Sequence, residues 1–435
     1  MEPLPPLCQI HARERCKIES HGNIPKAVRH WIKLVLSRLA MALAGATLGL
    51  LAAEALLRIT GLGHPGLYIY DRYSGWRLRP GAALWQTQEG RAHVVINSAG
   101  LRDREHRVAK PPNTVRIAFL GDSFTEAKQV PLGNTFCSVA ERELTQCPAL
   151  YGKNVETLNF GCDSYGTAQE LMTLRHRVWR FAPDVVVLAI CTGNDIRNDS
   201  IELEGDQCQP FFTYRDGELV AAGPFEESAW FRLQCMLRFD SQRSATLNLL
   251  GEVRSALRAR WRRRRLPQHY KAGASELGLD DWIYRPPATP AQREAWNIAE
   301  GEIEMVHQEA ARHGARFLAV TLSNGVQVYP DAAARRDYTR RWGMDGLFYP
   351  DLRIKALGER MGFDVLNVAP AFQAYADRHH VFLHGFNNTH LGTGHWNAAG
   401  HRCGGGLIAQ RLCEILQRPA QASGPQARNS STPGR

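Results

Sequence analysis

Five short apolar runs constrain the fold of this chain more than any other feature of its sequence. They are "TVRIAFL" (114–120), "NVETLNF" (154–160), "DVVVLAI" (184–190), "ARFLAVTL" (315–322) and "FDVLNV" (363–368). Each run is bounded by Gly, Pro or Asp and is apolar at successive positions, so both faces of the strand it forms would be buried. Such runs are typical of strands in a parallel sheet.

Helical patterns lie between these runs. "TAQELMTLRHRVWRFA" (167–182) follows the second run, and residues 291–314 precede the fourth. The second of these helices has one apolar stripe and ends at Gly314, a residue type that often terminates helices. The stripe consists of Trp296, Ala299, Ile303, Val306 and Ala310. Alternating strands and helices predict an α/β fold, a doubly wound parallel sheet of the flavodoxin-like three-layer kind, which binds ligands at the carboxyl ends of its strands.

A long apolar stretch near the N-terminus indicates a membrane anchor. Residues 39–57, interrupted only by Glu54, would form a helix of about 28 Å, roughly one bilayer core. Seven basic residues precede the stretch and Arg58 is the first to follow it, which predicts a cytoplasmic N-terminus and an exported main domain. Two alternatives are a signal peptide cleaved near "AEA" and a buried core helix.

The domain boundaries follow from these patterns. We expect a basic leader (1–38), a transmembrane anchor (39–58), an irregular collar (62–113) and a main domain (114–417). Residues 200–290 interrupt the main domain, and we interpret them as an insertion that shapes the site. The insertion contains a hairpin turning at Asp216-Gly217 and the arginine run "RSALRARWRRRR" (254–265). Residues 418–435 are rich in Pro, Ser, Gln and Gly and predict a disordered tail.

Charge and cysteine content exclude several classes of protein. The net charge is +10, but much of the excess lies in the first 38 residues and the arginine run, so nucleic-acid binding is not expected. The ten cysteines form no C-x-x-C pair, which argues against a zinc ribbon or a thioredoxin-type site. Cys137 with Cys147, or Cys208 with Cys235, could form disulfides in an oxidising compartment, although buried free thiols are the default expectation.

The loop after the first strand contains a candidate nucleophile. In "GDSFTEA", Ser123 directly follows a strand on a tight turn and begins a helix, so its hydroxyl is expected to lie exposed above the sheet. Asp122 would support the turn. The alternative is a serine that only caps the helix.

The loops after the second and third strands could bind an oxyanion. Acyl transfer requires hydrogen-bond donors around the tetrahedral intermediate. The Gly-rich loop "NFGCDSYGT" can present a backbone N–H, and Asn194 in "CTGND" can present its side-chain amide. Taken singly, each could also be an ordinary turn residue.

The candidate base is His395, in "NTHLGTGHWNAAGHR" (388–402). It lies after the last parallel strand and just before a helix that starts near Asn397, which returns it to the edge of the sheet where Ser123 lies. His390 and His401 do not have this position. A lone histidine between glycines is more often a surface turn residue, but three other strand ends favour catalysis.

With these residues in place, the chain resembles the SGNH (GDSL-type) hydrolase superfamily. The four blocks occur in the family's order: the Ser block "GDSFTEA", the Gly block "LNFGCDSYGTAQEL", the Asn block "TGND" and the His block "GHWNAAGH". The resemblance implies Ser123 as nucleophile, Asn194 as oxyanion donor and His395 as base. Ser164 stands where the family has its donor glycine, with Gly166 as a second candidate. The anchor followed by "NSAGLRDREH" is similar to a bacterial group of membrane-anchored members.

The resemblance also implies an acid that this sequence lacks at the usual place. The family has an Asp two or three residues before the histidine, and this chain has Thr393 and Gly392 there. We therefore expect either a Ser-His dyad, with a backbone carbonyl fixing the imidazole, or a triad whose acid, such as Asp163, comes from elsewhere in the fold.

The function implied is that of a membrane-anchored serine esterase on the periplasmic side of a bacterial inner membrane. It would hydrolyse an O-acyl ester, with acetyl preferred, on an envelope or exported polysaccharide, without a metal or other cofactor. Three alternatives remain open: an O-acyltransferase using the same residues, a lipid-directed esterase, and a non-catalytic binding protein on a degenerate hydrolase scaffold. The missing acid is the main support for the last.

Overall fold

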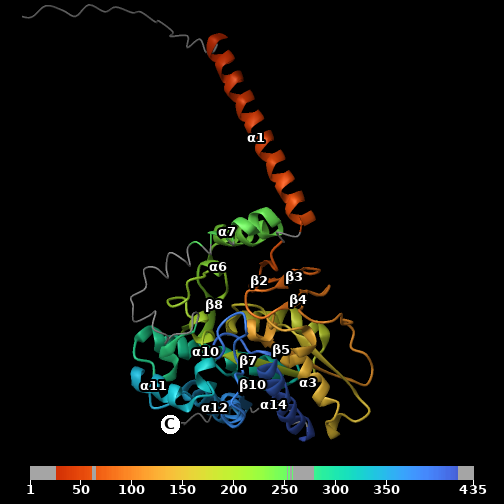
Figure 1. The fold of residues 1–435 in the computed structure, drawn as a ribbon, viewed down its shortest axis with the longest axis vertical. Coiled ribbons are helices and arrows are strands. Elements are labelled where there is room, and N and C mark those ends of the chain that lie inside the picture. The colour runs from red at the N-terminus through yellow and green to blue at the C-terminus, as the bar shows by residue number, and fades with distance from the viewer. Residues whose placement is uncertain (1–25, 61–64, 252, 255–256, 258–278, 420–435) are drawn as a thin grey trace, which may run out of the picture. The chain divides into compact units, whose positions relative to one another are not determined.

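The structure is a computed structural model that describes residues 26–60, 65–251, 253–254, 257 and 279–419 (Figure 1). Residues 1–25 of the basic leader, most of the arginine run and residues 420–435 of the expected tail lie outside the described residues. The chain divides into two compact units, Met1–Ile59 and Thr60–Arg435.

Helix α1 (Lys26–Thr60) belongs to the first unit. Its most apolar window has a mean hydropathy of 1.8, and none of that window is buried. Near its end, Arg58 pairs with Glu54 at 2.7 Å, one helical turn away. By its length and composition, α1 could cross a bilayer.

The second unit contains a five-stranded parallel sheet (Figure 1). Its strands are β5 (Thr114–Gly121), β6 (Asn154–Asn159), β7 (Val185–Cys191), β10 (Arg316–Leu322) and β11 (Asp364–Asn367). The spatial order β6-β5-β7-β10-β11 is the flavodoxin-like order of doubly wound folds. The predicted fold is therefore confirmed, and all five apolar runs are strands of this sheet.

Two apolar cores lie on the two faces of the sheet, because alternate side chains of each strand point in opposite directions. In β7, Val185, Val187 and Ala189 belong to one core, and Val186 and Leu188 belong to the other. One face is covered by α3 (Phe136–Leu144), α13 (Ala369–His379) and α14 (Ala398–Gln417). The other is covered by α4 (Thr167–Thr173), α10 (Pro290–Arg312) and α12 (Tyr349–Met361). The predicted stripe of α10 is fully buried in the second core.

The segment expected to be an irregular collar contains two antiparallel hairpins. Strand β1 (Tyr68–Asp71) pairs with β2 (Gly75–Leu78), and β3 (Ala83–Gln86) pairs with β4 (Ala92–Val95). A third apolar core joins these hairpins to the Gly-block loop and to α7 (Ala229–Asp240) through Trp76, Ile96, Tyr165 and Phe239. The collar is therefore packed onto the α/β domain.

The interruption of the α/β alternation begins with the predicted hairpin. Strands β8 (Phe211–Arg215) and β9 (Glu218–Ala222) are joined by Asp216 and Gly217, whose φ angles of 52° and 85° are those of a two-residue hairpin turn. Helix α6 (Pro224–Glu227) and α7 follow. Helix α11 (Ala332–Trp342) packs through Tyr338 against residues 283–284, at the end of the insertion.

Two disulfides occur among the described residues, which corrects the default expectation of free thiols. Cys208 bonds to Cys235, one of the two pairings considered from the sequence. Cys147 bonds to Cys413 of α14 rather than to Cys137, which is a buried free thiol. Cys413 lies 266 residues from Cys147 in the sequence but close to it in space, since α14 packs against α3.

Candidate active site

The Ser block turns directly from strand to helix. Strand β5 ends at Gly121, and α2 (Ser123–Glu126) begins two residues later. Asp122 caps this helix, because its Oδ1 accepts the Phe124 N–H at 2.9 Å. The turn leaves Ser123 at the carboxyl end of the sheet with 8% of its surface exposed. Its hydroxyl can therefore meet a substrate while the surrounding backbone stays buried.

A buried arginine of the "NSAGLRDREH" segment fixes the backbone behind Ser123. The Arg102 guanidinium donates to the carbonyl of Glu126 at 2.7 Å and to two further carbonyls of the same turn. Burial lowers the pKa of Arg102 to about 10, which leaves it charged at neutral pH. The adjacent Asp103 accepts the N–H of Asn159 at 3.0 Å, at the end of β6. This segment thus ties the collar to the Ser and Gly blocks.

His395 lies on the loop of residues 380–397 between α13 and α14, here called the His loop. A second, fully buried Ser–His pair supports this loop: His384 Nε2 lies 3.0 Å from Ser323 Oγ, and His384 Nδ1 lies 2.7 Å from the carbonyl of Gly394. Burial lowers the pKa of His384 to about 4, so the ring is neutral and its Nδ1–H donates to that carbonyl. His384 therefore holds the residue directly before His395.

The other two histidines of this stretch have different environments. His390 is exposed at the rim of the cavity that contains Ser123. His401 is buried, and its Nδ1 accepts the N–H of Phe136 at 3.3 Å. Burial lowers the pKa of His401 to about 3. Of the three histidines, His395 has its ring against Ser123.

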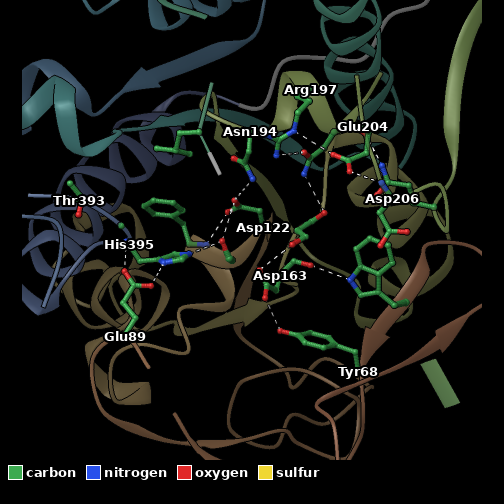
Figure 2. A pocket seen from close by; sticks show the side chains of 18 of the residues that line it. Tyr68, Glu89, Asp122, Asp163, Asn194, Arg197, Glu204, Asp206, Thr393 and His395 are labelled. Atoms are coloured by element: carbon green, nitrogen blue, oxygen red, sulfur yellow. Dashed lines mark hydrogen bonds and ion pairs between the residues drawn. The ribbon is translucent and has the colours of Figure 1, made fainter. Parts of the chain in front are cut away.

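Ser123, His395 and Glu89 form a continuous hydrogen-bonded chain, of which Figure 2 labels His395 and Glu89. His395 Nε2 lies 2.8 Å from Ser123 Oγ, and His395 Nδ1 lies 2.6 Å from Glu89 Oε2. The other carboxylate oxygen of Glu89 accepts the backbone N–H of His395 at 2.8 Å. Because a carboxylate only accepts, Nδ1 carries the ring proton and Nε2 is free to accept the proton of the Ser123 hydroxyl.

Glu89 was not identified from the sequence. It lies in the collar, on the tip of the β3–β4 hairpin (residues 87–91), 306 residues before His395. The glycine in front of His395 makes room for it: a Cβ atom on Gly394 would collide with Glu89 Oε1. The Gly-Thr-Gly sequence that stands where the family has its acid thus admits an acid from another part of the chain.

Asn388 of the His loop clamps the hairpin tip that carries Glu89. Its side-chain amide donates to the carbonyls of Thr87 at 2.9 Å and Gly90 at 3.0 Å, and its oxygen accepts the Gly90 N–H at 3.0 Å. Gly90 has a φ of 68°, and a Cβ there would collide with Gln129 and Phe386. Only glycine allows this approach. Asn388 is therefore a positioning residue for Glu89.

We expect Asn388→Ala to lower kcat/KM for an aryl acetate by about 10- to 100-fold, because Glu89 would lose the contacts that hold it against the imidazole. The acid limb of the pH–rate profile should also move to lower pH, since His395 would lose part of its carboxylate partner. The exposed neighbour Asn387 serves as the matched control, with Asn387→Ala leaving both quantities unchanged. An unchanged acid limb in Asn388→Ala would contradict the positioning role.

The charges of the pair are mutually stabilised. Burial alone would lower the pKa of His395, but the hydrogen bond and the negative charge of Glu89 raise it by more, so that the pKa of His395 is raised. Burial raises the pKa of Glu89, and the hydrogen bonds and charge of His395 outweigh this, so that its pKa is lowered. The arrangement therefore favours a carboxylate beside an imidazole that readily accepts a proton.

Three candidate oxyanion donors belong to residues that line one cavity: Ser123, Ser164 and Asn194. Asn194, in the turn between β7 and α5 (Asp195–Asn198), uses one amide N–H to contact Asp122 Oδ2 at 3.2 Å. Its second amide hydrogen is available to the cavity. Among the described residues, the backbone N–H groups of Ser123 and Ser164 have no protein acceptor. The three can therefore donate to a substrate oxygen.

Ser164 and Gly166 differ in their suitability as donors. Ser164 is exposed, lines the cavity and has a φ of 62°, the left-handed conformation that glycine adopts most easily. The N–H of Gly166 is buried and donates to Gln169 Oε1 at 3.2 Å. The geometry thus favours Ser164 over Gly166 as the donor. The backbone at Ser164 has a conformation that is typical of glycine.

Asp163, the acid considered from the sequence as a triad member, has other partners. Its side chain contacts Lys128 at 2.5 Å and accepts a hydrogen bond from Tyr68 at 3.3 Å. Burial raises the pKa of Asp163, but the ammonium of Lys128 more than offsets this and lowers it overall. Figure 2 shows Asp163 directed towards Tyr68, while Glu89 lies against His395.

The candidate catalytic and oxyanion residues, together with Glu89, line one cavity of about 1070 Å³. Both aromatic and hydrogen-bonding side chains line it. They include Tyr68, Trp76 and Phe239, and Asn198, Gln209, Arg197 and Arg238. Several charges are paired within the wall: Arg238 contacts Asp206 at 2.7 Å and Arg197 contacts Glu204 at 3.5 Å. Charged side chains of the wall are thus partly compensated by one another, and Ser123, Ser164, Asn194 and His395 also line the cavity.

Four carboxyl groups are buried near one another behind the Gly and Asn blocks: Glu170 of α4, Asp195 of α5, Asp199 directly after α5, and Glu302 of α10. Burial raises the pKa of each, to about 7 for Asp199. Burial thus favours the protonated forms of these carboxyls, and Asp199 Oδ1 accepts the N–H of Ala168 in α4 at 3.3 Å. They connect the helices that follow the Gly and Asn blocks to α10.

The sheet order and the meeting of the Ser, Gly, Asn and His blocks at its carboxyl edge decide the fold. The chain has a doubly wound α/β fold with flavodoxin-like strand order, which fits the fold expected of an SGNH-type hydrolase. No protein-family model matches the sequence, and no curated protein does. The fold resembles that of solved esterases and acylhydrolases.

Three of these solved structures illustrate the extent of the similarity. The acetyl xylan esterase AlAXEase is 14% identical, and the match covers 69% of this chain and 99% of that one, with a TM-score of 0.33. The lipase/acylhydrolase from Enterococcus faecalis is 13% identical over 71% of this chain and 100% of its own, with a TM-score of 0.33. Axe2, an acetylxylan esterase from Geobacillus stearothermophilus, is 11% identical over 71% and 97%, with a TM-score of 0.34.

Proposed function

We propose that this chain is a serine esterase of the SGNH type, belonging to a bacterial membrane-anchored group. The observation that carries the proposal is the chain of contacts from Glu89 through His395 to Ser123, at 2.6 Å and 2.8 Å. A serine, an imidazole and a carboxylate in this order are the parts that nucleophilic acyl transfer needs. The non-catalytic alternative drew its support from a missing acid, and Glu89 supplies a candidate for it.

The proposed reaction has two halves. Ser123 Oγ attacks the ester carbonyl while His395 Nε2 takes the hydroxyl proton, and the oxyanion is held by the amide of Asn194 and the N–H groups of Ser123 and Ser164. The proton passes to the leaving alcohol, and the acyl group stays on Ser123. Water then attacks the acyl-enzyme, with His395 again as base, and the carboxylic acid leaves. Glu89 stabilises the imidazolium in both halves.

We propose an O-acyl, preferably acetyl, ester of an envelope or exported polysaccharide as the substrate. Sugars present both hydroxyl groups and apolar C–H faces, and the cavity wall combines hydrogen-bonding side chains such as Asn198 and Gln209 with the rings of Trp76 and Phe239. A cavity specific for a long acyl chain would be lined mainly by aliphatic residues. This composition supports a glycan ester over a lipid ester.

We propose that α1 anchors the domain in the inner membrane with the active site in the periplasm. The length and hydropathy of α1 support a span, and the excess of basic residues before it supports a cytoplasmic N-terminus. The two disulfides support an oxidising compartment for the second unit, since disulfides persist on the exported side.

The proposal is tested by labelling the purified protein with a fluorophosphonate, which reacts with activated serines. We expect the parent protein to be labelled on the peptide that contains Ser123 and to hydrolyse an aryl acetate, and Ser123→Ala to lose both properties. Ser164→Ala is the matched control, because its donor is the backbone N–H and labelling should persist. Equal labelling of the parent and Ser123→Ala would rule out Ser123 as the nucleophile.

A further inference from the structure

Helix α7 has an apolar face that is turned away from the domain. Trp230, Leu233 and Leu237 follow one another at spacings of three and four residues and are 67%, 37% and 59% exposed. Leu247 and Leu250, in the helical segment 245–251 that follows, are 46% and 58% exposed. The outer face of a helix in a soluble domain is normally polar. Exposed apolar side chains grouped along a helix in this way are typical of an interaction surface.

The opposite side of α7 fixes this orientation. Cys235 is fully buried and bonded to Cys208, and Phe239 is 5% exposed and stacks on Trp76 with ring centroids 5.4 Å apart. The helix is thus held to the domain by a covalent bond and by the third core. These contacts prevent α7 from rotating about its axis to bury Trp230. The apolar face can therefore be covered only by a partner outside the domain.

The chain enters the second unit beside this face. The N–H of Gly66 donates to the carbonyl of Gln242, just after α7, at 2.7 Å, and the carbonyl of Gly66 accepts from Arg79 at 3.0 Å. A Cβ on Gly66 would lie 2.9 Å from the side chain of Gln242, so the contact is close. Gly66 follows the last residue of α1, Thr60, by only six positions in the sequence. A membrane that anchors α1 would therefore keep the surface around Gln242 near it, because so few residues connect the two.

We propose that the outer face of α7 and of residues 245–250 inserts into the interfacial region of the bilayer that α1 spans. Interfacial helices use tryptophan and leucine on one face with arginines beside them, and Arg232 and Arg243 lie in and directly after α7. The inference rests on the proposed anchor but not on the proposed chemistry. A second copy of the chain on this face is the competing occupant.

Helix α7 also forms one wall of the active-site cavity, so its insertion into a bilayer would place that cavity at the membrane surface. Arg238 and Phe239 line the cavity, whereas Trp230, Leu233 and Leu237 lie on the outer face of the same helix. Figure 1 shows α7 lying across the end of the second unit, away from the central sheet. The bilayer would thus fix the orientation of the cavity towards substrates that pass along its surface.

The test uses the full-length protein in lipid nanodiscs whose acyl chains are brominated, which quench only tryptophans that contact lipid. We expect these lipids to remove most of the Trp230 emission, measured as the difference between the parent and Trp230→Phe. Acrylamide in the water should quench that emission weakly. In Trp230→Phe/Tyr151→Trp, which moves the tryptophan to an equally exposed residue after α3, the pattern should reverse.

Two other outcomes would overturn the proposal. Trp230 emission quenched by acrylamide and not by brominated lipid would mean that the face is in water. Emission protected from both quenchers would mean that a protein covers it, as in a dimer. A tryptophan inside the proposed span reports separately on the anchor: in Trp230→Phe/Leu48→Trp, lipid quenching of the added emission, taken as the difference from Trp230→Phe, shows whether α1 is inserted when α7 is not.

Discussion

Replacing Glu89 by Gln is expected to lower kcat/KM for an aryl acetate by roughly 10³- to 10⁴-fold, the loss typical of a triad that loses its acid. The amide cannot stabilise the imidazolium by charge. If its NH₂ faces Nδ1, it also favours the wrong ring tautomer, with the proton on the nitrogen that must accept from Ser123. Backbone changes should be small, because Gln can keep the contact that Glu89 Oε1 makes with the His395 N–H at 2.8 Å.

The same substitution should shift the acid limb of the pH–rate profile. His395 works as a base only when neutral, so the rate falls as the pH drops through the pKa of His395. Glu89 raises the pKa of His395 above its ordinary value near 6.5, against the lowering effect of burial. Without the carboxylate, burial dominates and the pKa of His395 falls. The acid limb should therefore lie at lower pH in Glu89→Gln than in the parent.

The measurement is kcat/KM from pH 4 to pH 9 for both proteins, since this ratio reports the groups of the free enzyme. Gln88, exposed on the same hairpin tip, provides the control, and Gln88→Ala should leave the rate and the profile as they are. If Glu89→Gln retained the parent's rate and acid limb, the site would work as a Ser-His dyad and Glu89 would be structural.

Removing the Cys147–Cys413 disulfide is expected to have the largest effect on stability. The bond closes a loop with a sequence separation of 266 residues, so in the chain-entropy description its loss costs up to about 5 kcal/mol. The double variant Cys147→Ser/Cys413→Ser should therefore unfold at a temperature lower by roughly 10 °C. Both cysteines are replaced so that no unpaired thiol remains.

The second disulfide provides the comparison. Cys208 and Cys235 are 27 residues apart, so Cys208→Ser/Cys235→Ser should lose less, about 3 to 4 kcal/mol. Thermal unfolding of the full-length protein in detergent, with and without a reducing agent, measures both effects. Equal unfolding temperatures for the reduced and the oxidised parent would show that the bonds do not form, and would remove the support they give to an exported domain.

The regular parts of the fold could be predicted because their signals are local. Buried strands such as β7 are continuous apolar runs, the stripe of α10 repeats with the period of a helix, and Asp216-Gly217 carries its own turn preference. The convergence of Ser123, Asn194 and His395 followed from one rule about the edge of a parallel sheet. None of these inferences required knowledge of which distant residues touch.

The missed features all depend on contacts between distant segments. Glu89 is one of 43 acidic residues, and nothing near it in the sequence distinguishes it from the others. Its role arises from the Asn388 clamp and from the space beside Gly394, both of which belong to another loop. The Cys147–Cys413 bond likewise joins α14 to the segment after α3. Periodicity carries no information about such pairings.

The hairpin tip also sets the smallest piece of the chain that could be active. A fragment beginning at Thr114 would contain all four sequence blocks, and with them the hydroxyl, the oxyanion donors and the imidazole. It would lack the carboxylate, because Glu89 lies 25 residues earlier, as well as Arg102, which supports the turn behind Ser123. Trimming the protein to its recognisable core would thus keep the serine and the histidine but remove the proposed acid of the site.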